Sequence, residues 1–449
     1  MHSTRTANTQ IATRGAWCHY VAMLVAFLVG MMTCQLGFAQ THGTARTHPT
    51  QPDHTAPKPP HPEPADPEEP GPTQEYKELP VDDSKDGPKK NVSKVAPILT
   101  AGKFGDGEKE MFDEYYQNYF LPRWSLVKNI GTLPKERKDL RNQLARRSVG
   151  GSAVVHDRLN ELVLDSMKTL VVGDFHPAVR INAMLMIGDL NRVESVGSEK
   201  AVPLPEAFKI LLAAVENPKL SDALRAEAMV GILRHANASI QDDDVQPLTA
   251  AMLRLATADL PTGPSASGCA WIRAQAIETL GALGSVGNNN AVFDAMLKTV
   301  ADDKLPFFTR SAAADSLGQL NYSSATGIRP VETATTLGQY AIDVCDEELR
   351  LVKKPVTLVW RRQVLQRLAA ILSALSGAKD ASGAEDANHK GIASLAKDPN
   401  QQAYVGELRQ TIDEVCKSLD DKDQDDKSMK AVVLELQKKL KACLEKKPK

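Results

Sequence analysis

The sequence predicts an all-α protein of stacked helix pairs, preceded by an export segment and a proline-rich linker. The first sign is a repeated phrase, in which an arginine is followed by an alanine three residues later and an apolar residue seven later. It occurs as VRINAMLMIGDL (Val179–Leu190), LRAEAMVGIL (Leu224–Leu233), IRAQAIETLGAL (Ile272–Leu283) and TRSAAADSLGQL (Thr309–Leu320). The second sign is composition: aromatic residues make up only 5% of the chain, and alanine and leucine dominate the apolar set, which favours helix.

The spacing of the repeated phrase predicts how the helices are arranged. Its arginines, together with the arginine of a fifth, less regular unit, lie 45, 48, 37 and 51 residues apart. They are Arg180, Arg225, Arg273, Arg310 and Arg361. Repeats of roughly 40–47 residues with two helices each are typical of helical solenoids, because one pair cannot bury its apolar face alone.

The first forty residues are typical of an export segment. Arg5 and Arg14 precede a stretch without charged side chains, whose centre, Val21–Gly30, is strongly apolar. Small residues follow, ending at Ala39. Residues 1–39 are therefore predicted to be a signal peptide cleaved after Ala39 or an uncleaved N-terminal membrane anchor. Both alternatives place the rest of the chain in the periplasm or outside the cell, with membrane association through this segment in the second.

Residues 40–104 are predicted to be a disordered linker. Residues 41–100 contain 13 of the 27 prolines. Proline has no backbone N–H to donate to a helix or a sheet, so such a segment favours an extended, polyproline-II-like stalk.

Residues 105–153 are predicted to be an N-terminal helical cap with an aromatic face. The rings of this segment include Tyr115, Tyr116, Tyr119 and Trp124, the first three at helical spacing. We expect the aromatic face to pack over the first repeat, and the alternative is a protein-binding surface. The segment Arg123–Arg147 has eight basic and two acidic residues, as expected for a solvated helix face.

Residues 154–376 are predicted to form five helix pairs, and residues 377–449 a C-terminal helical cap. In the first pair, Leu159, Leu162, Val163, Met167 and Leu170 form an apolar stripe at helical spacing. The Arg180 helix follows, after a break at Asp174 and Pro177. In each pair the second helix carries the arginine, and the alanine and leucine positions that follow it continue one apolar face.

These units resemble HEAT repeats, a family of armadillo-like helical repeats, over residues 155–376. The resemblance rests on the Pro or Asp turn before the second helix, the apolar residue and arginine at its start, and the alanine and leucine positions after. It implies a right-handed α-solenoid in which the five arginines stack neighbouring units. It also implies an aspartate six residues before the arginine that reaches a neighbouring arginine. Asp174 fits that position, but Lys219, Ser267 and Lys304 occupy it in the next three units.

The sequence contains no motif for catalysis or cofactor binding. The glycine-rich phosphate loops, GxSxG and HExxH are absent, so we expect no cofactor, metal or small-molecule substrate. A net charge of −2 argues against nucleic acid. The four cysteines after the leader lack CxxC spacing, and we expect buried or half-buried thiols at Cys269, Cys345, Cys416 and Cys443. We expect His235, which stands where sister units carry leucine, to be a hydrogen-bonded core histidine.

The resulting hypothesis is a non-enzymatic scaffold that binds a protein partner with polar positions of the second helices. Those candidates are Asn182, Glu227, Gln275, Glu278 and Asp315, with His235 as a further one. Two alternatives stay open. A HEAT-like lyase or cofactor carrier would bring His176, His235 and nearby acids together. A module that binds envelope polymers or lipid surfaces would use the basic segment Arg123–Arg147.

Overall fold

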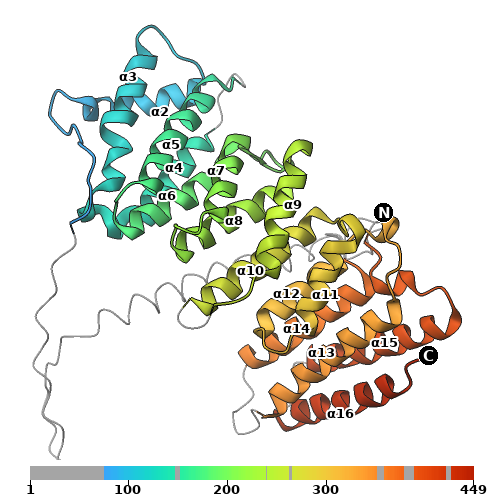
Figure 1. The fold of residues 1–449 in the computed structure, drawn as a ribbon. Coiled ribbons are helices and arrows are strands. Elements are labelled where there is room, and N and C mark those ends of the chain that lie inside the picture. Colours follow the sequence, from blue (N-terminus) through green and yellow to red (C-terminus); the bar gives the residue numbers. More distant parts are fainter. Residues whose placement is uncertain are drawn as a thin grey trace, which may run out of the picture. The chain divides into compact units, whose positions relative to one another are not determined.

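The computed structural model describes residues 75–146, 152–238, 240–261, 265–350, 358–378, 389–420 and 426–448. The predicted signal or anchor segment, residues 1–39, lies outside them. The prediction of an all-α protein is confirmed (Figure 1). Apart from isolated bridges, the strands of the described ranges are β1 (Asn191–Val193) and β2 (Val202–Pro203), which pair antiparallel. None of the helices in these ranges is long and apolar enough to cross a membrane.

The folded unit begins at Glu75, earlier than the predicted linker boundary at residue 104. The helices of its N-terminal part are η1 (Pro88–Asn91), α2 (Val92–Ala101), α3 (Glu108–Tyr115), η2 (Tyr116–Phe120), η3 (Pro122–Ser125), η4 (Val127–Thr132) and α4 (Leu133–Leu144). The linker prediction was therefore wrong for its last part, since α2 lies inside it.

The reason for this error is local. Val95, Ile98 and Leu99 recur at helical spacing and are buried, and their burial outweighs the helix-breaking tendency of Pro97 inside α2. The chain before α2 is also held by hydrogen bonds. The Lys77 amide donates to the Asp174 carbonyl at 2.9 Å, and the Leu79 amide donates to Ser125 Oγ at 2.8 Å.

Five consecutive helix pairs follow. The first helices are α5 (Val154–Val172), α7 (Pro205–Glu216), α9 (Asp242–Thr257), α11 (Ala291–Ala301) and α13 (Pro330–Arg350). The second helices are α6 (Pro177–Asp189), α8 (Asp222–Ala238), α10 (Ala266–Leu283), α12 (Phe307–Gly318) and α14 (Leu358–Ser376). Each second helix packs against the first helix of its own pair and against the next second helix in the row. Short 3-10 turns, η5 (Asn288–Asn290) and η6 (Tyr322–Ser324), lie in the connections around α11 and α12.

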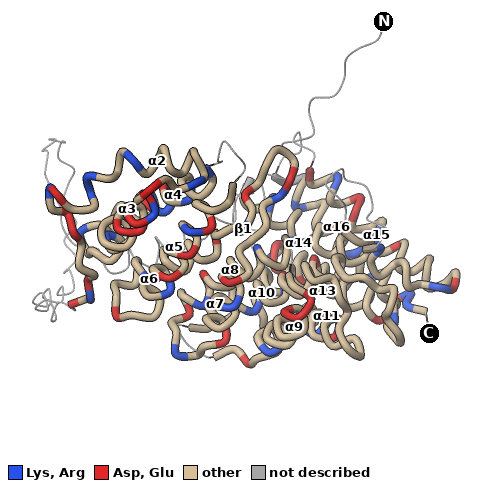
Figure 2. Tube along the Cα trace, turned by 90° about the horizontal axis from the view of Figure 1, so that it is seen from above, with Lys and Arg blue, Asp and Glu red and all other residues tan. Residues whose placement is uncertain are grey.

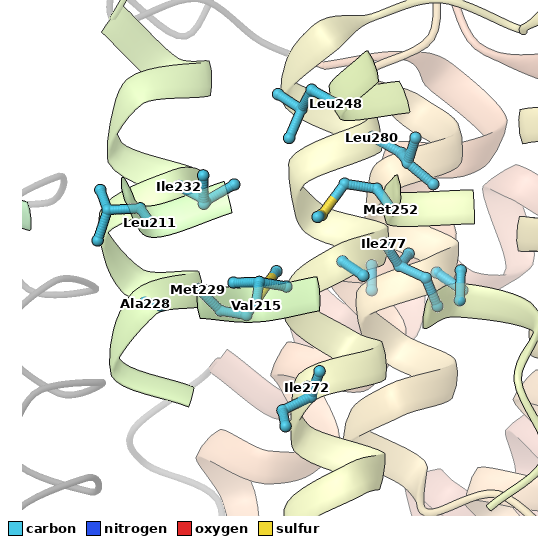
Figure 3. Close-up of a cluster of buried hydrophobic side chains, with 14 of the residues drawn as sticks. Leu211, Val215, Ala228, Met229, Ile232, Leu248, Met252, Ile272, Ile277 and Leu280 are labelled. Atoms are coloured by element: carbon cyan, nitrogen blue, oxygen red, sulfur yellow. The ribbon is translucent and has the colours of Figure 1, made fainter. Parts of the chain in front are cut away.

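The core between neighbouring pairs is mainly aliphatic where α7 to α10 meet (Figure 3). It includes Leu211, Val215, Ala228, Met229, Ile232, Leu248, Met252, Ile272, Ile277 and Leu280. Burial of each large aliphatic side chain stabilises the fold by about 1.5–3 kcal/mol. This cluster joins two pairs, so neither pair could bury its face alone.

Glycines set the close approach of the second helices. Gly188 of α6, Gly281 of α10 and Gly318 of α12 each lie eight residues after the arginine of their helix. A Cβ atom at Gly188 would lie 3.1 Å from Gly231 Cα on α8, and one at Gly281 would lie 2.8 Å from Ser316 Oγ on α12. A side chain at these positions would push the row of second helices apart.

The arginines of the repeated phrase bind backbone carbonyls. Their acceptors are the carbonyls of Val171 for Arg180, Val215 for Arg225, Ala258 for Arg273 and Val300 for Arg310. Each acceptor lies at the C-terminal end of the first helix of the same pair, where carbonyls have no intrahelical partner. These four arginines therefore join the two helices of one pair.

Two of the predicted stacking contacts differ from expectation. Arg361 of α14 donates to the Leu419 carbonyl in the C-terminal region, outside its own pair. Asp174 is exposed, and no ion pair joins it to an arginine in the part of the chain that the structure describes. A contact of the expected kind, to a neighbouring pair, occurs once in these ranges, between Arg310 and Asp343 of α13 at 2.6 Å.

The C-terminal helices are η7 (Ile392–Leu395), α15 (Pro399–Asp420) and α16 (Asp426–Glu445). α15 and α16 pack against each other, and both contact α13. The four cysteines within the described residues are free thiols that are buried or half-buried, as expected.

Candidate functional site

The polar positions of the second helices form a candidate site, which we call the second-helix face. It consists of the residues two, five and nine positions after the arginine of each helix. At 100° per residue these positions lie within about 60° of one another, opposite the alanine and leucine positions that face the core. The face includes Asn182, Asp189, Glu227, Arg234, Gln275, Glu278, Asp315 and Gln319.

At the N-terminal end of this face, α4 covers its carboxylates. α4 packs against α6, and Figure 2 shows basic residues along it. Glu227 is only 3% exposed, and its Oε2 has no hydrogen-bond partner. Burial raises the pKa of Glu227 to about 7, and the positive charge of Arg137 on α4 opposes that rise. Burial likewise raises the pKa of Asp189, against the charges of Arg137, Arg234 and Arg141.

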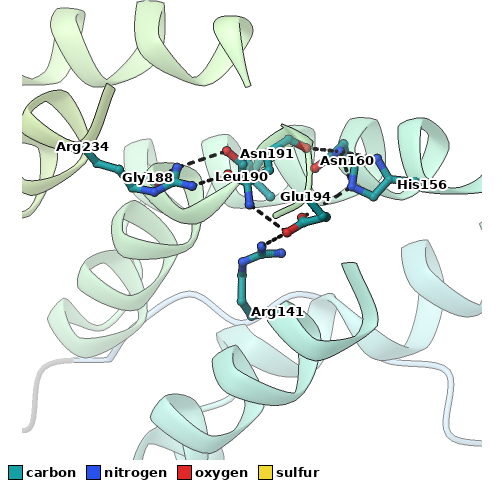
Figure 4. A network of polar contacts seen from close by, with 8 residues as sticks. All are labelled: Arg141, His156, Asn160, Gly188, Leu190, Asn191, Glu194 and Arg234. Carbon is teal, nitrogen blue, oxygen red and sulfur yellow. Dashed lines mark hydrogen bonds and ion pairs between the residues drawn. The ribbon is translucent and has the colours of Figure 1, made fainter. Parts of the chain in front are cut away.

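An ion pair beside these residues ties α4 to the β-ribbon (Figure 4). Arg141 of α4 binds the carboxylate of Glu194, which also accepts from Asn191 Nδ2 at 2.8 Å. His156 Nε2 of α5 lies 3.5 Å from Glu194 Oε1. Burial alone would raise the pKa of Glu194, but its contacts with His156, Arg141 and Asn191 outweigh burial and bring that pKa to about 2.

The same network continues to α8. Arg234 Nη1 donates to the Gly188 carbonyl at 3.0 Å, and its other terminal nitrogen binds the Asn191 side chain. Asn160 Nδ2 of α5 donates to the Asn191 carbonyl at 2.9 Å. Arginines from α4 and α8 therefore surround the carboxylates of this end, so negative charge is compensated within the chain.

Further along the face, on α10 and α12, the arrangement differs. Gln275 Nε2 donates to Glu278 Oε2 at 2.7 Å, and Gln319 Nε2 donates to Asp315 Oδ2 at 3.1 Å. Burial and the neighbouring charge of Asp315 raise the pKa of Glu278 to about 7, against the Gln275 hydrogen bond. Glu278 is half-buried and Asp315 exposed. Within the described ranges, no lysine or arginine forms an ion pair with either carboxylate.

The predicted aromatic residues lie in the core of the N-terminal cap. Tyr115, Tyr116 and Trp124 are buried, and Tyr119 is half-buried beneath the Arg123 guanidinium. The rings contact one another, with the centroids of Tyr115 and Tyr116 5.1 Å apart. Tyr115, Tyr116 and Trp124 pack inside the cap, and buried rings offer no surface to a partner. The alternative of a protein-binding surface at these three residues is therefore wrong.

Three other candidates are also enclosed. Asn182 is buried and donates to the Ala178 carbonyl of its own helix at 2.9 Å. Gln275 is buried and supports Glu278, while Glu227 lies under the charge of Arg137. Of the predicted polar positions, Glu278 and Asp315 are the ones that keep solvent exposure on this face.

The histidines do not meet. His176 caps the start of α6 by accepting from the Ala178 amide at 3.2 Å, while His235 lies near the end of α8. His235 is 2% exposed, and its Nε2 has no hydrogen-bond partner, contrary to the expectation of a satisfied core histidine. Burial and the charge of Arg234 lower its pKa to about 4.

No protein-family model matches this chain, and no curated protein matches it either. The resemblance to HEAT repeats therefore rests on the residues of this chain.

Proposed function

We propose that this chain is a non-catalytic scaffold, a HEAT-like α-solenoid that binds a protein partner through the second-helix face of α10 and α12. The observation that carries the proposal is the pair Glu278 and Asp315, two neighbouring carboxylates without a cationic partner in the described ranges. Such a like-charge pair is stabilised by an approaching cation. The partner surface is therefore basic.

The chain supplies its own precedent for this interaction. At the N-terminal end of the same face, Arg137 and Arg141 of α4 lie near Asp189, and Arg137 lies near Glu227. A basic helix thus lies near carboxylates of this face within the molecule, and its positive charges oppose the rise in their pKa values that burial causes. We propose that a lysine- or arginine-rich segment of the partner does so at Glu278 and Asp315, where arginine would add bidentate hydrogen bonds.

The test is the binding of a fluorescent peptide of alternating lysine and alanine to the full chain, measured by anisotropy. We expect the double variant Glu278→Gln, Asp315→Asn to bind it at least tenfold more weakly than the unchanged chain. Binding should also weaken between pH 8 and pH 5.5, because Glu278, whose pKa is about 7, gains a proton over that range.

The matched control removes two carboxylates elsewhere. Glu435 and Glu445 are exposed on α16, and the double variant Glu435→Gln, Glu445→Gln should bind the peptide as the unchanged chain does. Equal losses in both double variants would mean non-specific attraction to a chain of net charge −2 and would refute the proposed site. Absence of peptide binding would refute it as well.

We also propose that the scaffold is exported, with residues 1–39 as its signal peptide or anchor. The supporting pattern is the apolar stretch Val21–Gly30 after two arginines. Mass spectrometry of the chain from its native host should give a mature N-terminus at Gln40 if the segment is cleaved. An intact N-terminus on protein that partitions with soluble cytoplasmic proteins would contradict export.

A further inference from the structure

The part of the second-helix face on α10 and α12, which we call its open end, also carries two aromatic residues. They are Trp271 of α10 and Phe308 of α12, and each lies two residues before the arginine of its helix. At 100° per residue this position falls within the angular range of the positions that define the face. The Thr309 hydroxyl donates to the Ala270 carbonyl at 3.4 Å, so the two aromatic residues lie beside a direct contact between the two helices.

Phe308 is unusually accessible for an aromatic residue. It is 47% exposed, and Trp271 is half-buried. The other exposed large hydrophobic side chains of the described ranges are valines and one leucine, so Phe308 is the only aromatic ring among them. At the equivalent position the sister helices carry Ala178, Ala223 and Val359. Aromatic rings therefore occur at this position on the same two helices that carry the carboxylate pair of the open end.

The rings and the carboxylates are regularly spaced. Glu278 follows Trp271 by seven residues on α10, and Asp315 follows Phe308 by seven residues on α12. Seven residues are about two helical turns, so each carboxylate lies roughly 10 Å beyond the ring on the same side of its helix. A complementary partner needs an apolar side chain and a cation at that distance from each other. A single helix supplies them at positions seven residues apart.

Helix α4 shows that a helix of this kind can lie on the second-helix face. Its residues Leu133, Leu140 and Leu144 are buried, and α4 packs against α6. Its arginines Arg137 and Arg141 lie near a carboxylate of the face. Arg137 and Leu144 are seven residues apart. The chain thus already places the apolar and basic side chains of one amphipathic helix at the other end of this face.

We propose that the partner of the open end is an amphipathic helix with an apolar side chain and a lysine or arginine seven residues apart. The apolar side chain contacts Trp271 and Phe308, and the cation binds Glu278 and Asp315. This inference rests on the proposed function, because it takes the basic partner from there and adds the apolar anchor. Burial of the rings drives the association, and the charges set the register of the helix.

The test compares two alanine-based helical peptides by fluorescence anisotropy with the full chain. The matched peptide has a leucine at its centre and a lysine seven residues to either side, so that it fits in either orientation. The control peptide has the same composition, with its leucine on the opposite side of the helix. We expect the matched peptide to bind at least fivefold more tightly. Equal binding of the two would overturn the apolar anchor and leave the proposed function standing, since the peptide of alternating lysine and alanine tests that function separately.

A third peptide tests whether the partner is a helix. It has the leucine and lysines of the matched peptide, but proline replaces one alanine between the leucine and each lysine, which breaks the helix. We expect at least tenfold weaker binding than with the matched peptide. Equally tight binding would mean that the open end accepts an extended chain and would overturn the helical partner.

Two variants of the chain assign the anchor to its residues. Phe308→Ala should abolish the advantage of the matched peptide over the control peptide, while both still bind through their lysines. Leu434→Ala, at a position of α16 that is 42% exposed, should keep that advantage. An advantage that persists in Phe308→Ala would overturn the proposal. So would a dimer of the unchanged chain that Phe308→Ala converts to a monomer in sedimentation equilibrium, because a second copy would then occupy the open end.

Discussion

The two ends of the second-helix face carry the same kind of residue in opposite electrostatic settings. Near α6 and α8, the carboxylates of Asp189 and Glu227 lie close to arginines of the chain itself. Near α10 and α12, Glu278 and Asp315 have each other, two glutamines and Ser373 of α14 as polar neighbours. Helix geometry is the same at both ends, so the difference comes from α4, which covers the first end.

This comparison shows how the chain itself can cover one end of a repeated surface and leave the other end open to a binding partner. At one end, the basic helix α4 covers the face and makes it an internal interface. The ion pair between Arg141 of α4 and Glu194 lies beside this end of the face. Burial raises the pKa of Glu227 and of Glu278 alike to about 7, but a positive charge of the chain opposes that rise only at Glu227. The following variants test that difference, from the largest expected effect to the smallest.

Replacing Arg141 by methionine should have the largest effect, a loss of about 3 kcal/mol in the free energy of unfolding. The side chains of Arg141 and Glu194 are 24% and 14% exposed, and removal of the arginine leaves the largely buried carboxylate with only its Asn191 and His156 contacts. Urea denaturation at pH 7 measures the loss. Lys417→Met, which breaks the exposed pair with Asp413, should leave stability unchanged. Similar losses in both variants would contradict the structural role of the Arg141 pair.

Replacing Glu227 by glutamine should stabilise the fold at pH 8 by about 2 kcal/mol. The pKa of Glu227 rises from 4.5 to about 7 on folding, which corresponds to about 3 kcal/mol. The Oε2 position of Glu227 has no hydrogen-bond partner, so the unpaired amide of glutamine reduces the net gain.

The sign of this effect fixes its pH dependence. The pKa of Glu227 in the folded state lies above its value in the unfolded state. Its contribution to the free energy of unfolding is therefore fully present below about pH 4.5 and is lost as pH rises through about 7. The advantage of Glu227→Gln should therefore shrink between pH 8 and pH 5 in urea denaturation. The control Glu206→Gln, at an exposed position of α7, should show no such difference. A gain that is equal at both pH values would refute burial as its cause.

Replacing Asp315 by lysine should give the smallest effect, a gain of about 0.5–1 kcal/mol at pH 8. The change removes the negative charge that helps to raise the pKa of Glu278 and places a positive charge beside it, so that pKa should fall from about 7 towards its ordinary range. NMR titration of the Glu278 carboxyl measures the shift. Asp243→Lys, an equal charge change at an exposed site on α9, should leave that pKa unchanged. An unaltered pKa in Asp315→Lys would show that the two carboxylates do not interact.

The all-α class follows from the sequence, and so do helices over residues 154–376, where five helix pairs were predicted. The reason is that apolar positions three, seven and ten residues after the arginine specify the buried side of a helix. The acceptors of these arginines could not be predicted, because a backbone carbonyl such as that of Val171 or Val300 leaves no residue signature. The expected aspartate partner was wrong for the same reason: carbonyls at helix ends meet the need that Asp174 was expected to meet.

The charged network was foreseen in part. The basic segment Arg123–Arg147 was visible in the sequence, but its partners Glu194 and Asp189 lie on other elements, and only the packing of α4 against α6 brings them together. The unpaired nitrogen of His235 had a single sequence signal, a histidine in a leucine position. Which neighbours a polar side chain meets depends on tertiary packing, and periodicity does not encode it.

The central claim is that a cationic segment binds the open end of the second-helix face. Its most direct test is an NMR titration of the Glu278 carboxyl in the full chain, with and without a saturating peptide of alternating lysine and alanine. If lysines of the peptide approach Glu278 and Asp315, the pKa of Glu278 should fall from about 7 by at least one unit when the peptide is bound. A pKa that stays at about 7 with the peptide bound would contradict the claim.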